Sequence, residues 1–441
     1  MRFLPPIALS LAVALALPCA TPAIAAEAQR AEVAAAAQRL QGKVVDWRRD
    51  IHQHPELGNR EFRTAALIAD HLRALGLEPV TGVAYTGVTA VLRGGRPGPR
   101  LALRADMDAL PVTEQVDVPF ASKVTTEYRG QTTGVMHACG HDAHVAILMG
   151  VAEALVAMRE ELPGEVLFVF QPAEEGAPEG EEGGAELMLK EGVFDRFRPD
   201  AVFGLHVGSG LNANQIGVRP GPIMAASDSF RIVVHGRQAH GSRPWQSVDP
   251  IITAAQIINA AQTIVSRNVN LIQQPAVLTF GAVNGGIRSN IIPDSVELIG
   301  TIRTFDDGMR AQILQRLDTI ATQVAAANGA SVSTEIPQPG SYPVTVNDPD
   351  LTARLRPSLE AVAGAAQVVT VPVTTGAEDF SFFARRVPGL FFNVGTTPVG
   401  QDAGQAPTNH SPLFYIDEAA LDLGLRAMLQ ATLDYLDPPA S

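Results

Sequence analysis

Two regions of the chain differ in how their apolar and polar residues alternate. In the first half, short and almost continuously apolar runs alternate with longer stretches of helical periodicity. The apolar runs are VTAVLRG from Val88, RLALRAD from Arg100, EVLFVFQP from Glu165 and DAVFGLHV from Asp200, and the clearest helical stretch is AHVAILMGVAEALVAMREE from Ala143. Strands that are apolar throughout are typical of a mainly parallel sheet buried between helices. The pattern therefore predicts an α/β domain.

The last part of the chain returns to this pattern. VVTVPV from Val368 and GLFFNVG from Gly389 predict two further strands, and residues 417–435 predict a closing helix. We therefore expect residues 27–224 and 338–441 to form one mainly parallel α/β domain from two pieces of chain.

Residues 225–337 follow a different order. SFRIVVHG, AVLTFGAVNGG, SVELIGTIRTF and ASVSTEI predict strands, whereas DPIITAAQIINAAQTIVSRN and DGMRAQILQRLDTIATQVAAANG predict helices. In chain order this is β-α-β-β-α-β, the ferredoxin-like split pattern. Gly221-Pro222 and residues 337–340 are suitable hinges at its two ends. We therefore predict a small domain inserted into the α/β domain.

The first 26 residues predict a signal peptide. They read MRFLPPIALSLAVALALPCATPAIAA, with one positive charge at Arg2, an apolar run from Ile7 to Leu17 and small residues near the end. This run is too short and too interrupted by proline to span a membrane, and no later segment approaches about 18 consecutive apolar residues. We expect cleavage after Ala26 and a periplasmic or secreted protein without membrane segments.

Composition and charge narrow the function classes. After cleavage about 415 of the 441 residues remain, more than one ordinary domain needs, so two domains are expected. The formal net charge of −13 gives no electrostatic footprint for nucleic acid or an anionic membrane. Of the 2 cysteines, Cys19 lies in the cleaved segment. Cys139 is therefore alone in the mature chain and has no partner for an intramolecular disulfide.

Cys139 lies in the unusual segment VMHACGHDAH. Burial as a small apolar residue would account for a lone thiol in an oxidising compartment. The alternative is that a metal holds the cysteine as a thiolate. His141 is two residues away, and Gly140 would permit a tight loop that presents both side chains to one ion. Two local ligands are too few for such a site, so others must come from elsewhere in the chain.

Three other segments supply suitable ligands near predicted strand ends. FVFQPAEEG places Glu174 and Glu175 after a strand, VFGLHVG places His206 near the end of another, and NHSPLF places His410 between the last strand and the last helix. In open α/β sheets, sites form beyond the carboxyl ends of the strands. One carboxylate pair or one histidine would be weak evidence, but the four segments together indicate a metal site.

This set of ligands suits a pair of divalent ions. One thiolate, three imidazoles and one carboxylate suit Zn²⁺, with Mn²⁺, Co²⁺ or Ni²⁺ as alternatives. Five ligands exceed what one catalytic ion needs if it keeps an open position, which favours two ions bridged by Cys139 and by water. One glutamate of the pair is then free to take a proton from the water and to deliver it to a leaving amine.

Ten motifs are spread along the chain from about residue 45 to the C-terminus. They are HQHPELG at His52, LRADMDALP at Leu103, GVMHACGHDAH at Gly134, QPAEEG at Gln171, GLHVG at Gly204, VRPGPIMAASD at Val218, TIVSRNV at Thr263, NIIPD at Asn290, GAEDF at Gly376 and NHSPLF at Asn409. In this order the sequence resembles the hippurate hydrolase and auxin-conjugate hydrolase family. That family belongs to the superfamily of co-catalytic metal aminoacylases and carboxypeptidases, and the combination of HACGHD with QPAEEG is highly specific for it.

The resemblance implies a role for each of several residues. The metal ligands would be Cys139, His141, Glu175, His206 and His410, and the general base would be Glu174. The inserted domain would serve as a lid and as the pairing surface of a homodimer or higher homo-oligomer. His240, in HGRQAHGSRP, would help bind the developing oxyanion across the dimer interface, and Asn290 would hold a substrate carboxylate. The alternative for His240 is an exposed loop residue.

Other polar residues near these motifs have structural interpretations. His137 and His144 would pack or hydrogen-bond beside the ligands, and His52 and His54 would be helix-end and turn residues before Pro55. Asp106, Asp108 and Glu378 would orient ligand imidazoles, as carboxylates behind a metal site often do.

The predicted lid loop departs from the family pattern. It reads QAHGSRPWQSVDP, whereas many relatives carry a Gly-His-Ala and a Pro-His arrangement there. Arg243, Pro244 and Trp245 therefore differ at the mouth of the site. The preference for hippurate or auxin conjugates does not carry over directly.

Together these observations predict a metal-dependent amidohydrolase. Its substrate would be a small molecule, either an N-acyl amino acid or a short peptide with a free carboxylate. A carboxypeptidase or dipeptidase of the same superfamily is the alternative among enzymes. A periplasmic protein that binds metal or peptide without turnover is the alternative outside them, since two lobes and a hinge also fit that class.

Overall fold

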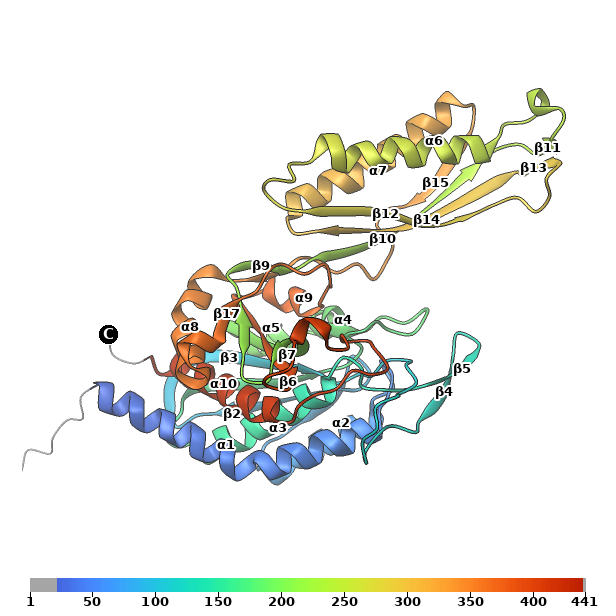
Figure 1. The fold of residues 1–441 in the computed structure, drawn as a ribbon. Coiled ribbons are helices and arrows are strands. Elements are labelled where there is room, and N and C mark those ends of the chain that lie inside the picture. Colours follow the sequence, from blue (N-terminus) through green and yellow to red (C-terminus); the bar gives the residue numbers. More distant parts are fainter. Residues whose placement is uncertain (1–21, 439–441) are drawn as a thin grey trace, which may run out of the picture.

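The computed structural model describes residues 22–438, which form a large α/β part and a smaller part beside it (Figure 1). Residues 1–21, most of the expected signal peptide, lie outside the described residues. Helix α1 (Pro22–Gln53) begins within the last residues of that expected segment. Within residues 22–438, no helix combines the length and the apolar composition that crossing a membrane requires.

The large part is built on an eight-stranded sheet. Its order is β1 (Val80–Val83), β2 (Gly87–Arg93), β6 (Pro163–Gln171), β3 (Arg96–Asp106), β7 (Ala201–Asn212), β18 (Gly389–Thr397), β8 (Ile216–Val218) and β17 (Val368–Thr370). The pairs β3–β6, β3–β7, β7–β18 and β8–β17 are parallel, whereas β1–β2, β2–β6 and β8–β18 are antiparallel. The predicted mainly parallel α/β class is thus confirmed.

Helices bury both faces of this sheet. Helices α1, α3 (His141–Ala157) and α10 (Ala419–Leu436) pack on one another over one face, with α2 (Phe62–Ala74) and α8 (Pro349–Ala363) beside them. The shorter helices α4 (Gly184–Lys190), α5 (Val193–Phe197) and α9 (Phe380–Ala384) cover the other face. Along β6, Phe168 and Phe170 belong to the first core, whereas Leu167 and Val169 belong to the second. This alternation explains why the strand is apolar throughout.

The remaining elements of the large part are short. They are the hairpin of β4 (Thr125–Tyr128) and β5 (Gln131–Gly134), the pair β9 (Gly221–Met224) and β16 (Thr345–Asn347), and the turns η3 (Ala365–Gln367) and η4 (Ala403–Gln405). Strand β9 pairs with β16 where the chain leaves the large part and returns to it. These two strands therefore frame the connections to the small part.

The small part is a four-stranded antiparallel sheet covered by two helices on one face (Figure 1). Its longer elements are, in chain order, β10 (Ala226–His235), α6 (Pro250–Thr263), β12 (Ala276–Asn284), β14 (Ser295–Thr304), α7 (Asp307–Ala327) and β15 (Ser331–Glu335). The shorter elements are β11 (Ala239–His240), η1 (Pro244–Gln246), η2 (Ile264–Asn268) and β13 (Ile291–Ile292). Asp249 caps α6 by accepting hydrogen bonds from the backbone N–H groups of Ile251 and Ile252, and Pro250 occupies the first helical position.

Two connections join the small part to the large one. Ser227, at the start of β10, exchanges two backbone hydrogen bonds with Tyr342, each with an N···O distance of 2.9 Å. On the large-part side, the Ala225 N–H donates to the carbonyls of Thr374 and Gly376. The outgoing and returning strands are therefore fastened to each other at the boundary.

Candidate metal centre

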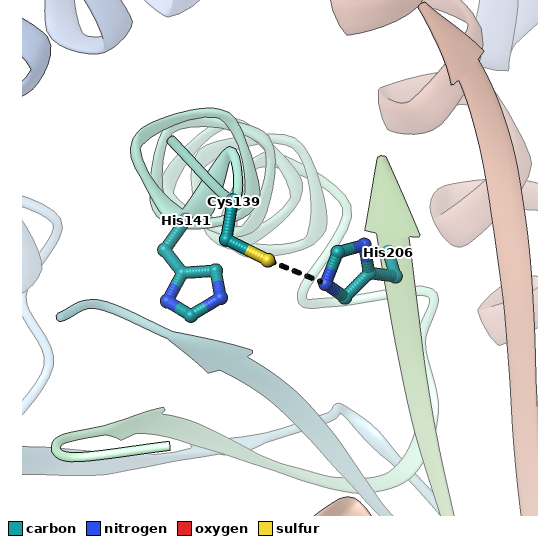
Figure 2. Close-up of side chains that lie close together, drawn as sticks. All are labelled: Cys139, His141 and His206. Atoms are coloured by element: carbon teal, nitrogen blue, oxygen red, sulfur yellow. Dashed lines mark hydrogen bonds between the residues drawn. The ribbon is translucent and has the colours of Figure 1, made fainter. Parts of the chain in front are cut away.

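The segment that contains Cys139 turns sharply at Gly140. Gly140 has a φ of +91°, and a Cβ atom built there would lie 2.3 Å from Cγ2 of Val207. Glycine is the residue that tolerates this conformation and this approach. Helix α3 begins at the next residue, so Cys139 and His141 both face the sheet from the helix start, as Figure 2 shows together with His206 from β7.

The structure brings the five predicted ligands together as two groups of three that share Cys139. One group is Cys139, His141 and His206, and the other is Cys139, Glu175 and His410. Within each group the potential ligand atoms all lie within 4.8 Å of one another. The Cys139 Sγ lies 3.4 Å from Nε2 of His206 and 3.3 Å from Nε2 of His410. A sulfur between two such groups is the arrangement expected of a bridging thiolate.

Two of the imidazoles are oriented for metal binding by hydrogen bonds on their far side. His206 donates from Nδ1 to the Val207 carbonyl at 2.7 Å, and Nδ1 of His141 lies 3.2 Å from Oδ1 of Asp108. Each ring therefore presents Nε2 to the centre. Burial also lowers the pKa of His206 to about 4, which keeps this imidazole neutral, as a ligand must be.

An unsatisfied nitrogen supports the presence of a cation at this centre. Nε2 of His141 is buried and has no hydrogen-bond partner among the residues that the structure describes. Carboxylate oxygens of Asp106, Glu174 and Glu175 lie 3.8, 3.9 and 4.0 Å from it, too far for hydrogen bonds. A buried polar atom without a partner costs about 1–3 kcal/mol, and a bound cation would remove that cost. The residues present thus fit a pair of divalent ions.

His410 reaches the centre from a loop. Its N–H donates to the Ala138 carbonyl at 2.8 Å, and its φ is +72°, a conformation that is uncommon for residues with a side chain. The neighbouring Asn409 donates to the carbonyls of Cys139 at 3.1 Å and Val207 at 3.0 Å. These bonds tie the loop to both the Cys139 turn and strand β7.

Glu174 lies beside the centre and belongs to neither group that contains Cys139. Its side chain is buried, and its pKa is raised because burial and the nearby carboxylates of Glu378, Glu175 and Asp379 all disfavour the charged form. A bound cation would oppose this shift. A carboxylate held beside a metal site with a raised pKa is suited to accepting a proton and returning it.

Buried carboxylates fix the backbone that carries Glu174 and Glu175. Asp108 accepts hydrogen bonds from the N–H groups of Glu174 at 3.1 Å and Glu175 at 3.0 Å. Glu61 accepts one from the N–H of Ala173 at 2.9 Å. Ala173 has a φ of +51°, a left-handed conformation that costs roughly 1–2 kcal/mol for a residue with a side chain. We call residues 173–175 the glutamate elbow.

The predicted supporting carboxylates have different partners. Asp108 contacts the predicted ligand His141 as expected, whereas Asp106 lies 2.5 Å from Nδ1 of His144, an imidazole that was not predicted to be a ligand. Glu378 contacts Arg104 at 2.8 Å, and among the described residues no imidazole lies within hydrogen-bond distance of it, so the prediction is wrong for Asp106 and Glu378. Arg104 is buried and also binds the carboxylates of Asp106 and Asp379. It neutralises a group of acids that would otherwise repel one another.

The remaining histidines near the motifs differ in their surroundings. His54 follows the end of α1 and contacts the Asp50 carbonyl at 2.8 Å, in keeping with a turn residue. His52 is also at the helix end, but it is buried between carboxylates of Asp142 at 2.8 Å and Glu114 at 3.0 Å, which the sequence did not suggest. His137 is buried without a hydrogen-bond partner, and burial lowers its pKa to about 3.

His240 and Asn290 lie together on the small part. Strand β11 pairs His240 with Ile291 of β13, and the Gly241 N–H donates to the Asn290 carbonyl at 2.9 Å. The His240 side chain is exposed, and its Nδ1 accepts a hydrogen bond from the Ser242 N–H at 3.0 Å. Both strands lie at the end of the small part that is remote from the large sheet (Figure 1). The described part of the chain shows no hydrogen bond between these two residues and the Cys139 centre.

Comparison with known proteins identifies the family. The family model for peptidase family M20/M25/M40 matches residues 102–434. The chain belongs to this family. Thermostable carboxypeptidase 2 of Saccharolobus solfataricus is 42% identical over 390 residues, which cover 87% of this chain and 94% of that protein. N-acetyl-L-cysteine deacetylase of Bacillus subtilis is 39% identical, and the match covers 87% of this chain and 85% of that protein. IAA-amino acid hydrolase ILR1-like 2 of Arabidopsis thaliana is 35% identical, and the match covers 90% of this chain and 87% of that protein.

Solved structures of M20 and related proteins show the same fold. A putative aminohydrolase from methicillin-resistant Staphylococcus aureus is 32% identical, with a TM-score of 0.84 and coverage of 92% of this chain and 100% of that one. The YXEP protein of Bacillus subtilis, described as a dinuclear metal-binding peptidase of the M20 family, is 34% identical, with a TM-score of 0.73 and coverage of 91% and 99%. The resemblance inferred from the motifs is thus confirmed. This M20 member is a metal-dependent hydrolase of amide bonds, which leaves the non-catalytic interpretation without support.

Proposed function

We propose that this M20 hydrolase cleaves the amide bond of N-acyl amino acids that carry a free carboxylate. The observation that carries the proposal is the buried Glu174 beside two groups of ligands that share Cys139. Relatives named as a deacetylase and an IAA-amino acid hydrolase support this substrate class. The ligand set favours two Zn²⁺ or Mn²⁺ ions, with Co²⁺ or Ni²⁺ as alternatives.

The chain's own residues would divide the work as follows. When bound, the two divalent ions would supply a Lewis acid that polarises the substrate carbonyl and lowers the pKa of water. Glu174 would take the proton of the attacking water and then deliver it to the leaving amine. Asp108 would fix the position of Glu174 relative to His141, because its carboxylate contacts both the backbone N–H of Glu174 and the ring of His141.

His240 and Asn290, which lie on the small part, would complete the site of another copy of the chain. His240 pairs with Ile291, the neighbour of Asn290, and Gly241 donates to the Asn290 carbonyl, which supports joint delivery, since a movement that brings one of these residues to a centre also brings the other. We propose that the small part of a second copy supplies them in a homodimer or higher homo-oligomer, with His240 on the oxyanion and Asn290 on the substrate carboxylate. We further propose that residues 1–26 direct the chain to the periplasm or outside the cell.

A carboxypeptidase or dipeptidase activity is the second candidate. It is favoured by the two thermostable carboxypeptidases of Saccharolobus solfataricus, which are 42% and 41% identical to this chain. The two candidates differ in the group on the acyl side of the scissile amide. N-acetyl and N-benzoyl amino acids, unblocked dipeptides and blocked peptides therefore separate them.

The test is hydrolysis of that panel by metal-reconstituted protein, beside Glu174→Gln and Glu175→Gln with bound metal counted in all three. We expect Glu174→Gln to keep its metal and to lose about 10²–10⁴-fold in kcat, the usual contribution of a general base. Glu175→Gln should lose metal as well as rate, since Glu175 belongs to a ligand group. A Glu174→Gln variant that turns over at the wild-type rate would overturn the assignment, and a panel without turnover would overturn the substrate class.

A further inference from the structure

Tyr342 connects the glutamate elbow to the boundary between the two parts. Its hydroxyl donates a hydrogen bond to the Glu174 carbonyl at 2.6 Å. Its backbone exchanges two hydrogen bonds with Ser227, the second residue of β10 in the small part. Tyr342 therefore contacts both Glu174, the general base proposed above, and β10, the first strand of the small part.

The other bonds to the elbow come from the large part. Glu61, just before α2, and Asp108, just after β3, accept hydrogen bonds from the N–H groups of residues 173–175. The elbow begins with the left-handed Ala173, so it continues neither β6 nor a helix and depends on such side-chain bonds for its position. Tyr342 supplies a bond to this elbow from the segment between β15 and β16, by which the chain returns from the small part.

The ring of Tyr342 is held in place by packing. It makes an edge-on contact with Phe382 of α9, with ring centroids 6.0 Å apart, and the residue is half-buried. Removing only the hydroxyl would therefore leave the ring contact and the two backbone bonds to Ser227 intact. The bond from the Tyr342 hydroxyl to the glutamate elbow can therefore be removed without removing the backbone bonds between Tyr342 and Ser227.

We propose that Tyr342 is a positioning residue that couples the orientation of the small part to the placement of Glu174. A rotation of the small part at the Ser227–Tyr342 pair would move the Tyr342 hydroxyl relative to the Glu174 carbonyl and would thereby shift the base. A misplacement of about 1 Å can change a rate by about 10²-fold, so this link makes proton transfer depend on the hinge. The inference rests on the proposed role of Glu174.

The test compares Tyr342→Phe with Tyr435→Phe as a matched control. Tyr435 is a buried tyrosine on α10 that likewise makes an edge-on contact with a phenylalanine, Phe203, and within residues 22–438 it shows no hydrogen bond to the elbow. For Tyr342→Phe we expect wild-type metal content, a kcat that falls by about 5-fold or more, and a KM that changes by less than about 2-fold. For Tyr435→Phe we expect wild-type values of kcat and KM.

Amide hydrogen exchange gives a readout that does not require activity. In Tyr342→Phe the peptide covering residues 171–176 should exchange faster, whereas peptides from the sheet core should exchange as in wild type. Equal exchange at the elbow in both variants, or equal kcat values, would overturn the coupling. If Glu174→Gln proves fully active while the elbow still loosens in Tyr342→Phe, the proposed base is wrong but the physical link stands.

Discussion

The substitution Gly140→Ala tests the turn that brings Cys139 and His141 into one group of potential metal ligands. The new methyl group would lie 2.3 Å from Cγ2 of Val207, whereas carbon atoms in contact normally lie about 3.5–4.0 Å apart. Val207 is fully buried in β7, so its side chain is surrounded by other atoms and cannot move away without displacing them. Overpacking of this kind typically costs about 1–3 kcal/mol, and the φ of +91° adds about 1–2 kcal/mol for a residue with a side chain.

Together these terms predict a loss of roughly 2–5 kcal/mol in the free energy of unfolding, against a typical total of about 5–15 kcal/mol. The midpoint of thermal unfolding should fall by roughly 4–20 °C. Because relief of the overlap displaces the segment between the two predicted ligands Cys139 and His141, the variant should also hold less metal. Thermal unfolding and elemental analysis of the purified protein measure both effects.

Gly42→Ala is the matched control, because the same methyl group is added to an exposed position inside helix α1 where no atom lies within 4 Å. Alanine in place of glycine there should stabilise the helix by roughly 0.5–1 kcal/mol. The two substitutions should therefore shift the midpoint in opposite directions. If Gly140→Ala unfolds at the wild-type temperature and binds the wild-type amount of metal, the geometry described for this turn is wrong.

Three further predictions use other parts of the structure. Burial lowers the pKa of His52, but the carboxylates of Asp142 and Glu114 outweigh this effect, so the pKa is raised in the folded protein. The charged His52 therefore stabilises the fold fully below about pH 6.5, the pKa of an unfolded histidine, and this stabilisation is lost as pH rises through the higher pKa of the folded state. His52→Gln should cost about 3–5 kcal/mol at pH 5.5 and less at pH 9, by urea unfolding at both values, and an equal cost at both would refute this. Asp249→Ala, which removes the cap of α6, should cost about 1 kcal/mol in the same assay while wild-type metal content is retained. Chelation should lower the thermal midpoint and added Zn²⁺ should restore it, since ions that bind the folded chain stabilise it; an unchanged midpoint would argue against a metal centre.

Much of this arrangement could be read from the sequence because the signals were local. The continuous apolar run of β6 predicted a strand buried on both faces, and Phe168 and Leu167 indeed lie in different cores. The ligands were predicted from four short segments next to predicted strands. The rule that sites form at the carboxyl ends of parallel strands was enough to expect that these segments meet.

The rest depended on pairings between distant parts of the chain. His52 looked like an ordinary helix end, because nothing near it in sequence indicates that Asp142 and Glu114 would enclose it. Arg104 stands within the run RLALRAD, which predicted only a strand, and its acid partners include Glu378 and Asp379, far along the chain. Likewise, β7 was expected to end near His206 but continues to Asn212, because its second half pairs with β18.

The position of β18 has a consequence for how the chain folds. This strand is an inner strand of the eight-stranded sheet, between β7 and β8, although it comes from the last part of the sequence. Its first residue, Gly389, pairs with Val202, so the contacts at the centre of the sheet close a very long loop. Such non-local contacts form slowly, whereas residues 226–335 can collapse from contacts within one continuous segment. A chain emerging from the ribosome therefore meets the conditions for folding its inserted domain well before the surrounding sheet, which stays divided until β18 has been synthesised.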